Sequence, residues 1–266
     1  MKELGFIGCG NMARAMMEGL LKTNRFSPED FIVSDKSEEA LSRISDELKI
    51  GCTTTDNHQV VKEAKTVIFA VKPQVFPCVA EELKDCIDSD KLVVSIVAGK
   101  STENIQSFSK NPLKIVRIMP NTPALVGEGM AGICSNSLVS GEELQYVKSL
   151  FESFGKAEIV SEHLMDAVVG VSGSAPAYVF MFIEAMADAA VAEGMPRQQA
   201  YTFAAQTVLG SAKMVLETGK HPGELKDMVC SPAGTTIEAV RVLEEKGMRS
   251  AVFEAVKACS EMSKKL

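Results

Sequence analysis

Near its N-terminus this chain of 266 residues reads Leu4-Gly5-Phe6-Ile7-Gly8-Cys9-Gly10-Asn11-Met12-Ala13, and this segment decides the fold. The apolar run Leu4–Ile7 predicts a buried strand, and a helical pattern of apolar residues starts at Met12. Between them, Gly8 permits a tight turn, Gly10 lets backbone N–H groups approach a pyrophosphate, and Ala13 keeps helix and strand close. Ordinary glycine-rich turns can share these letters, but the flanking strand and helix favour a dinucleotide site at the helix N-terminus.

Further apolar runs recur along the first part of the chain, with helical patterns between them. They are Phe31–Val33, Gly51–Thr54, Thr66–Val71, Lys91–Val97 and Lys114–Met119. Strands that are apolar on both faces and alternate with helices indicate a parallel doubly wound sheet. Lys156–Val160 predicts a last strand at the edge of that sheet. The predicted fold class is therefore α/β, with an N-terminal Rossmann-type doubly wound sheet.

The composition changes at about Ser161, after which alanine, methionine and helical spacing dominate and no strand is predicted. Helices are expected over Tyr178–Glu193, Gln199–Leu216, Glu224–Val229, Thr236–Lys246 and Met248–Lys264. We expect a dinucleotide-binding domain at 1–160 and an all-α domain for substrate binding and dimerisation at 161–266. Helices this apolar need cover from each other and from a second subunit, which predicts at least a dimer.

Composition excludes several classes of function. The formal net charge of −7 argues against a nucleic-acid-binding surface. The seven cysteines are scattered and form no C-x-x-C pair, and the three histidines are far apart, so neither disulfides nor a metal site are expected. Because the chain enters a strand directly after Met1 and contains no membrane-length apolar run, we expect no signal peptide and a cytoplasmic location.

In open α/β sheets, ligands bind beyond the carboxyl ends of the strands. The residues that follow the predicted strands are Gly8–Met12, Ser34–Lys36, Asn57, Ala70–Pro73, Ser95–Gly99 and Pro120–Pro123. Asp35 lies at the spacing expected for the acid that binds a ribose 2′-hydroxyl, and its carboxylate would repel a 2′-phosphate. Asp35 therefore favours NADH, whereas Ser34, Lys36 and Ser37 could instead hold the phosphate, and the choice stays open.

A second candidate site precedes a late helix. Ser231-Pro232-Ala233-Gly234-Thr235-Thr236 offers free backbone N–H groups and hydroxyls, which suit a carboxylate. By itself the segment is more typical of a plain helix-capping loop. The segment Val171–Tyr178 is similarly rich in small residues and can simply permit close packing.

Taken together, these segments resemble the pyrroline-5-carboxylate reductases, which catalyse the last step of proline synthesis. The matching stretches follow the family's order from about residue 4 to 260: the Gly8 turn, Ala70–Pro73, Arg117–Pro123, Ser172–Tyr178, Gly194–Arg197 and Asp227–Ile237. The resemblance implies hydride transfer from NADPH or NADH to the C=N carbon of 1-pyrroline-5-carboxylate, giving L-proline. The family commonly prefers NADPH, whereas Asp35 favours NADH. It also implies a homodimer and allows a ring of dimers.

The resemblance also implies roles for individual residues. It places Ile7, Gly8, Cys9, Gly10, Asn11, Met12, Asp35, Asn57, Ala70, Val71, Lys72, Pro73 and Ala98 at the cofactor. Ser231, Gly234 and the N–H of Thr235 would hold the substrate carboxylate, and Glu162 would lie near the substrate. The hydroxyl of Thr236 would meet the ring nitrogen, as the catalytic group. No metal is implied.

Two other functions fit parts of the sequence. A β-hydroxyacid dehydrogenase of the 6-phosphogluconate type needs a lysine general acid/base, and Lys213 and Lys226 lie in no matching motif. A regulator that binds NAD(P) without turnover would not need the Ser231–Thr236 loop. Both functions are therefore less favoured than a reductase.

Overall fold

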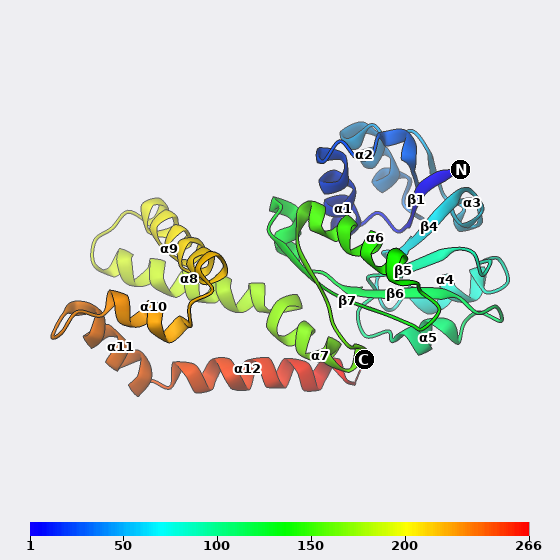
Figure 1. Cartoon of the computed structure of the whole chain (residues 1–266). Coiled ribbons are helices and arrows are strands. Elements are labelled where there is room, and N and C mark those ends of the chain that lie inside the picture. Colours follow the sequence, from blue (N-terminus) through cyan, green and yellow to red (C-terminus); the bar gives the residue numbers. More distant parts are fainter. Residues whose placement is uncertain (266) are drawn as a thin grey trace. The chain divides into compact units, whose positions relative to one another are not determined.

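The computed structural model describes residues 1–265, which form two compact units (Figure 1). The first unit contains Met1–Ser174 and the C-terminal residues from Cys259 onward, and the second contains Ala175–Ala258. The C-terminal residues belong to the first unit, where Ser263 Oγ donates a hydrogen bond to Asp166 Oδ1, 2.7 Å long.

The first unit is built on one eight-stranded sheet in the order β3-β2-β1-β4-β5-β6-β7-β8. The strands are β1 (Lys2–Ile7), β2 (Phe31–Ser34), β3 (Thr53–Thr54), β4 (Ala64–Phe69), β5 (Leu92–Ser95), β6 (Lys114–Met119), β7 (Gly129–Ser135) and β8 (Gly155–Ile159). All neighbouring pairs from β3 to β6 are parallel. The order of the first six strands is that of a Rossmann fold, so the predicted fold class is confirmed.

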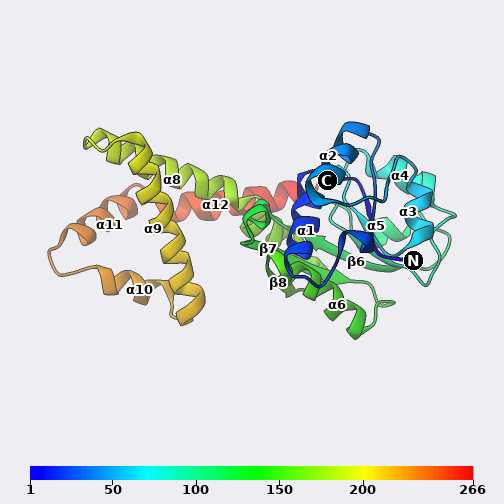
Figure 2. The same cartoon turned by 90° about the horizontal axis from the view of Figure 1, so that it is seen from above.

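The last two strands depart from a purely parallel sheet (Figure 2). β7 is antiparallel to β6, and β8 is parallel to β7 at the edge of the sheet. Only residues 120–128, with a short 3-10 turn over Thr122–Val126, connect β6 to β7. A parallel crossover needs a dozen or more residues, so this connection reverses the chain direction. The edge strand predicted at Lys156–Val160 is present as β8.

Helices cover both faces of the sheet. They are α1 (Asn11–Lys22), α2 (Glu38–Leu48), α3 (Asn57–Glu63), α4 (Phe76–Leu83), α5 (Thr102–Gln106), α6 (Gly141–Phe151) and α7 (Met165–Val168). One core cluster joins Phe6 to Met16 of α1 and Phe151 of α6, and the other joins Ile7 to Phe76 of α4. Adjacent residues of β1 thus face opposite cores, which is why its sequence is apolar throughout.

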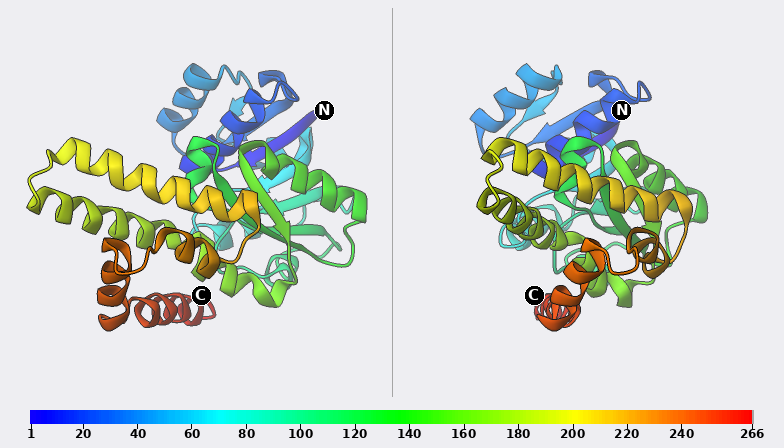
Figure 3. Two further views of the ribbon diagram at one scale, coloured as in Figure 1. Left: turned by 60° about the vertical axis from the view of Figure 1, so that its left-hand side comes forward. Right: turned by 90° about the vertical axis from the view of Figure 1, so that its left-hand side faces the viewer.

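The second unit is entirely helical, as predicted. Its helices are α8 (Ala175–Ala192), α9 (Arg197–Thr218), α10 (Pro222–Val229), α11 (Thr235–Glu245) and the first part of α12 (Met248–Ser263). α8 and α9 lie side by side (Figure 3) and bury Ala187, Ala200 and Ala204. Gly194, with φ +94°, ends α8, and Pro196 caps α9. A glycine at the end of one helix and a proline at the start of the next are the usual placement of these two residues.

Most large apolar side chains of the second unit are exposed in the single chain. Phe180, Met181, Phe203 and Phe253 each expose 60–69% of their surface. Large apolar side chains exposed in this number are typical of a surface that another chain covers. The helical run Glu162–Ala192 is also long and apolar enough to cross a membrane by length and composition. Helices packed within soluble proteins pass the same test, so this run is weak evidence for a membrane span.

Gly155 allows β7 and β8 to meet, because its backbone has φ +155° and ψ −144°, a conformation almost restricted to glycine. An added Cβ would also collide with the Gly129 carbonyl oxygen. We predict that Gly155→Ala lowers the free energy of unfolding by about 3 kcal/mol or more, measured by denaturant titration. Gly141→Ala is the matched control, since a Cβ there meets no atom within 4 Å. Equal stability of the two variants would contradict this assignment.

Candidate nucleotide site and substrate loop

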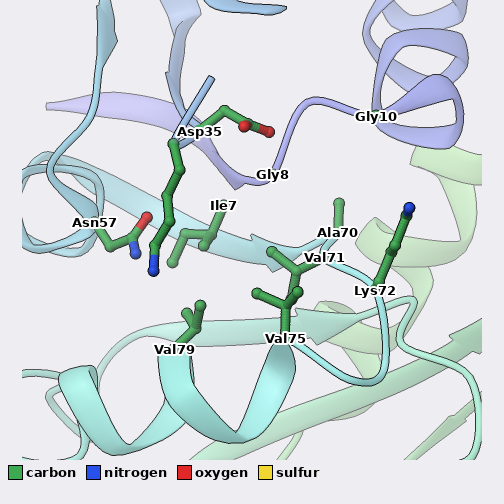
Figure 4. A pocket seen from close by; sticks show the side chains of 11 residues that line it. Ile7, Gly8, Gly10, Asp35, Asn57, Ala70, Val71, Lys72, Val75 and Val79 are labelled. Atoms are coloured by element: carbon green, nitrogen blue, oxygen red, sulfur yellow. The ribbon is translucent and has the colours of Figure 1, made fainter. Parts of the chain in front are cut away.

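A cavity of about 280 Å³ opens at the carboxyl ends of β1, β2 and β4 (Figure 4). Its lining is formed by residues that follow these strands and by the start of α4: Ile7, Gly8, Gly10, Asp35, Lys36, Asn57, Ala70, Val71, Lys72, Val75 and Val79. Eight of these residues were predicted as cofactor contacts. The structure therefore brings together groups that are far apart in the sequence at the edge where a Rossmann sheet binds its ligand.

The glycine-rich turn forms one wall of this cavity. Gly8 has φ +96°, its N–H donates to the Ser34 carbonyl at 2.8 Å, and an added Cβ would lie 2.8 Å from the Ala70 carbonyl oxygen. Gly10 caps α1 with extended backbone and would carry a Cβ into open space. No side chain caps α1, so its first N–H groups are free to bind an anion.

Asp35 is held in a fixed position beside the turn. Its Oδ2 accepts hydrogen bonds from the Cys9 backbone N–H at 2.9 Å and from Cys9 Sγ at 3.4 Å, and its Oδ1 accepts from the Ser37 N–H at 2.9 Å. Burial, followed by the charge of Asp35, raises the pKa of the Cys9 thiol to about 12. Cys9 therefore stays protonated and serves as a donor to the carboxylate.

Asn57 is oriented by a second set of hydrogen bonds. Its Oδ1 accepts from Ser34 Oγ at 2.7 Å, and its amide donates to both oxygens of Glu82 at 3.2 Å. Ser34 is fully buried, so the interpretation that it holds a 2′-phosphate is wrong. Ser37 Oγ accepts from the Ala40 N–H and caps α2. Of the groups considered for that phosphate, only Lys36 lines the cavity.

Five predicted cofactor contacts lie outside the lining: Cys9, Asn11, Met12, Pro73 and Ala98. Cys9 is buried behind the turn, and Ala98 follows β5 on the other side of β4. The lining also includes Val75 and Val79, which were not predicted. Their spacing of four residues at the start of the helix after β4 is the signal that could have identified them.

The second candidate site is the loop before α11, in the helical unit. Gly234 is the N-cap of α11, with no side-chain cap, and its N–H donates to the Ser231 carbonyl at 3.1 Å. A Cβ at Gly234 would collide with Ser231 Oγ, so a side chain there would displace this hydroxyl. Thr235 and Thr236 begin α11 with free N–H groups. The loop thus presents donors to an anion, with Ala233 held at φ +56°.

Glu162 belongs to the first unit, where it lies just after β8. Its carboxylate accepts hydrogen bonds from Thr102 and forms an ion pair with Arg117, 3.2 Å long. Burial alone would raise the pKa of this carboxyl, but the bonds from Thr102 and Arg117 outweigh it and lower the pKa. Glu162 is therefore charged at neutral pH.

One cluster of the described residues has spacing suited to a metal ion. Ligand atoms of Asp56, His58 and Glu82 lie within 4.8 Å of one another, and all three residues are exposed. Asp56 accepts from the His58 N–H to cap α3, and Glu82 accepts from Asn57. These contacts give both carboxylates structural roles without a metal.

Known protein families match both parts of the chain. Residues 162–266 match the family model "Pyrroline-5-carboxylate reductase dimerisation", and residues 3–99 match "NADP oxidoreductase coenzyme F420-dependent". Pyrroline-5-carboxylate reductase of Escherichia coli (strain K12) is 52% identical over 100% of this chain and 98% of its own. The enzyme of that name from Methanosarcina acetivorans is 48% identical over 100% and 98%.

Solved structures show the same likeness. A pyrroline-5-carboxylate reductase from Coxiella burnetii has a TM-score of 0.92 and 35% identity, covering 99% of this chain and 98% of that one. A pyrroline carboxylate reductase from Plasmodium falciparum, solved with NADP bound, has a TM-score of 0.89 and 32% identity, covering 99% and 97%.

The two glycines of the turn should respond differently to substitution. Gly10→Ala places a methyl group where a pyrophosphate would lie, in backbone geometry that alanine adopts freely. We predict a free energy of unfolding within about 1 kcal/mol of the wild type and NAD(P)H binding weaker by tenfold or more, on the order of 1.4 kcal/mol. Gly8→Ala should instead destabilise the fold, because of its positive φ and the Ala70 carbonyl. Nucleotide fluorescence titration and denaturant unfolding measure both effects, and unchanged binding by Gly10→Ala would contradict the pyrophosphate site.

Proposed function

Because the chain belongs to the pyrroline-5-carboxylate reductase family, we propose that it reduces the C=N bond of 1-pyrroline-5-carboxylate to L-proline with a hydride from NAD(P)H. The observation that carries this function is full-length identity of 52% to a reductase of that name. The chain is thus an oxidoreductase of proline biosynthesis, with a Rossmann-type domain and a helical domain.

The cavity beside the glycine-rich turn fits a dinucleotide. Free N–H groups at α1 suit the pyrophosphate, and the ammonium groups of Lys36 and Lys72 line the cavity. Among residues 1–265, neither ammonium group has a hydrogen-bond or ion-pair partner. The apolar walls of Ile7 and Val79 suit a base. When bound, NAD(P)H supplies the hydride, and these residues hold and orient it. The other predicted contacts, Cys9, Asn11, Met12, Pro73 and Ala98, stay proposals.

The loop before α11 is proposed to bind the substrate carboxylate. Ser231 offers a hydroxyl and Thr235 offers a backbone N–H at a helix N-terminus, where partial positive charge favours an anion. Gly234, whose own N–H donates to the Ser231 carbonyl, would line the same site without a free donor. Because Gly234 has no side chain, Ser231 Oγ can occupy the space beside it. The prediction that Glu162 lies near the substrate stays a prediction.

The reaction needs little acid–base chemistry from the protein. A protonated imine is already an electrophile, so orientation of its C5 against the nicotinamide C4 supplies much of the rate. The hydroxyl of Thr236, in the first turn of α11, is proposed to hydrogen-bond the ring nitrogen and orient the imine, with water as proton source. Thr236 is half-buried, which leaves its hydroxyl accessible to a ligand.

The chain forms a homo-oligomer through its helical part, which matches the dimerisation model of the family. We propose a homodimer, with residues 1–160 binding the cofactor and 161–266 binding substrate and the second subunit. The exposed apolar side chains of α8 and α9 and the match of residues 162–266 to the dimerisation model support the contact with the second subunit. We also propose a cytoplasmic location, which the seven free cysteines support.

Thr236→Ala tests the proposed catalytic group. We expect kcat to fall by about ten- to hundredfold, because an orienting hydrogen bond in the transition state is lost. Thr236→Ser keeps the hydroxyl and should retain most of the rate. Steady-state oxidation of NAD(P)H with 1-pyrroline-5-carboxylate measures both variants. If kcat and KM of Thr236→Ala equal those of the wild type, Thr236 is not the catalytic group.

Asp35 and Lys36 should bias the choice of cofactor in opposite directions. Asp35→Asn removes a negative charge while preserving shape, so a 2′-phosphate is no longer repelled. We predict that the ratio of kcat/KM for NADPH over NADH rises by about tenfold. Lys36→Gln should lower the same ratio, since it removes the lysine charge that lies next to Asp35 in the cavity lining. A ratio that does not respond to either change would show that the 2′ position binds elsewhere.

A further inference from the structure

We infer that Glu162 is a positioning residue that fixes the loop after β5 and thereby orders the nicotinamide half of the cofactor. The inference rests on the proposed use of NAD(P)H, and it assigns Glu162 a role within the protein in addition to its predicted place near the substrate.

Three hydrogen bonds occupy the carboxylate of Glu162. Its Oε1 accepts from the Thr102 backbone N–H at 2.8 Å and from Arg117 Nη1 at 3.2 Å, and its Oε2 accepts from Thr102 Oγ1 at 2.7 Å. Both oxygens are therefore engaged, and two of the three bonds reach one residue through its backbone and its side chain. Two hydrogen bonds to the same residue fix the position and orientation of Thr102.

The two partners of Glu162 flank one loop. β5 ends at Ser95, and Thr102 is the first residue of α5, so residues 96–101 form the connection between them. Arg117 lies on β6, where it is paired in register with Ser95. Glu162 thus connects the strand position beside the start of this loop to the residue at its end. Gly99, with φ +72°, lies between, so the loop contains a point of backbone freedom that the anchors must restrain.

This loop lies on the side of the sheet where the second half of a dinucleotide belongs. The cavity at the carboxyl ends of β1, β2 and β4 includes Asp35, which has the spacing expected for the acid that binds the adenosine ribose. A dinucleotide extends across the point where strand order reverses, so its other half lies over the carboxyl ends of β4 to β6. Residues 96–101 follow β5 at that edge, and they include Ala98, a predicted cofactor contact.

The environment of the cluster makes it a firm anchor. The side chain of Arg117 is 11% exposed, and Thr102 is buried. Loss of the carboxylate would leave a nearly buried guanidinium without its partner, which is costly. The bonds from Thr102 and Arg117 also keep the pKa of Glu162 low, so the anchor stays charged. A loop ordered before binding loses less entropy when the nicotinamide arrives and holds the ring in a reactive orientation.

Binding of whole and truncated cofactors tests this role. The variant is Glu162→Gln, and the probes are NADH and ADP-ribose, together with NADPH and 2′-phospho-ADP-ribose. We expect the dissociation constant of the reduced dinucleotide to rise about five- to tenfold, because the loop is no longer ordered. ADP-ribose lacks the nicotinamide, so its affinity should stay within about twofold of the wild type. Turnover by the same variant should show a lower kcat.

Two further substitutions separate positioning from folding. Thr102→Val removes the hydroxyl that donates to Oε2, whereas Thr102→Ser retains it, so only the valine variant should reproduce the effect of Glu162→Gln. Glu143→Gln is the matched control. Glu143 pairs with Lys114 at 2.6 Å, at the amino end of β6, and its loss should leave both affinities unchanged.

The outcomes are distinct. Selective loss of dinucleotide affinity in Glu162→Gln and Thr102→Val, with rescue in Thr102→Ser, supports the inference. Unchanged dinucleotide affinity in Glu162→Gln overturns it, as does an equal loss for ADP-ribose, which would indicate a general structural defect. The wild type tests the proposed function separately: if it binds the cofactors but does not oxidise them with 1-pyrroline-5-carboxylate, that function fails while the binding comparison still decides the role of Glu162.

Discussion

The close approach of β1 and β4 at their carboxyl ends is the constraint on which the nucleotide site depends. Gly8 turns there with a positive φ, and the Ala70 carbonyl lies where its side chain would be. Only glycine fits, because any Cβ would push the two strands apart. This glycine turn directs the start of α1 toward the cavity, so that the first N–H groups of that helix are available to a phosphate.

Around this turn, most polar groups are held by other protein groups rather than left free. Asp35 is bound to Cys9 and Ser37, and Asn57 to Ser34 and Glu82. Farther along the sheet, beyond β5, Glu162 is bound to Thr102 and Arg117 in the same way. Among residues 1–265, the side chains of Lys36 and Lys72, which line the cavity, have no hydrogen-bond or ion-pair partner, and the first N–H groups of α1 have no side-chain cap. Fixed carboxylates and amides with free cations form a site whose shape is set before the ligand arrives, which reduces the entropy lost on binding.

Local sequence patterns predicted most helices and strands. They did not predict the direction of every strand or which side chains lie close together. The run Lys114–Met119 coincides with β6, and the run Thr66–Val71 overlaps β4, which starts at Ala64. Gly194 and Pro196 mark the break between α8 and α9. The antiparallel direction of β7 was not predicted, since an apolar run does not encode the orientation of its neighbour. Val75 and Val79 were not predicted to line the cavity for a related reason: the sequence around them does not show that the start of α4 faces it.

The sequence by itself determined the order of strands and helices, the glycine turn and the chemical groups that follow each strand. These features depend on periodicity and on backbone freedom, which neighbouring residues set. Only the tertiary structure decided that Ser34 is buried against Asn57, that Asp35 binds the turn, and that Glu162 joins Thr102 to Arg117. Those partners lie 23 to 60 positions apart. Packing across the sheet decides which polar groups come into contact, and no local sequence pattern contains that information.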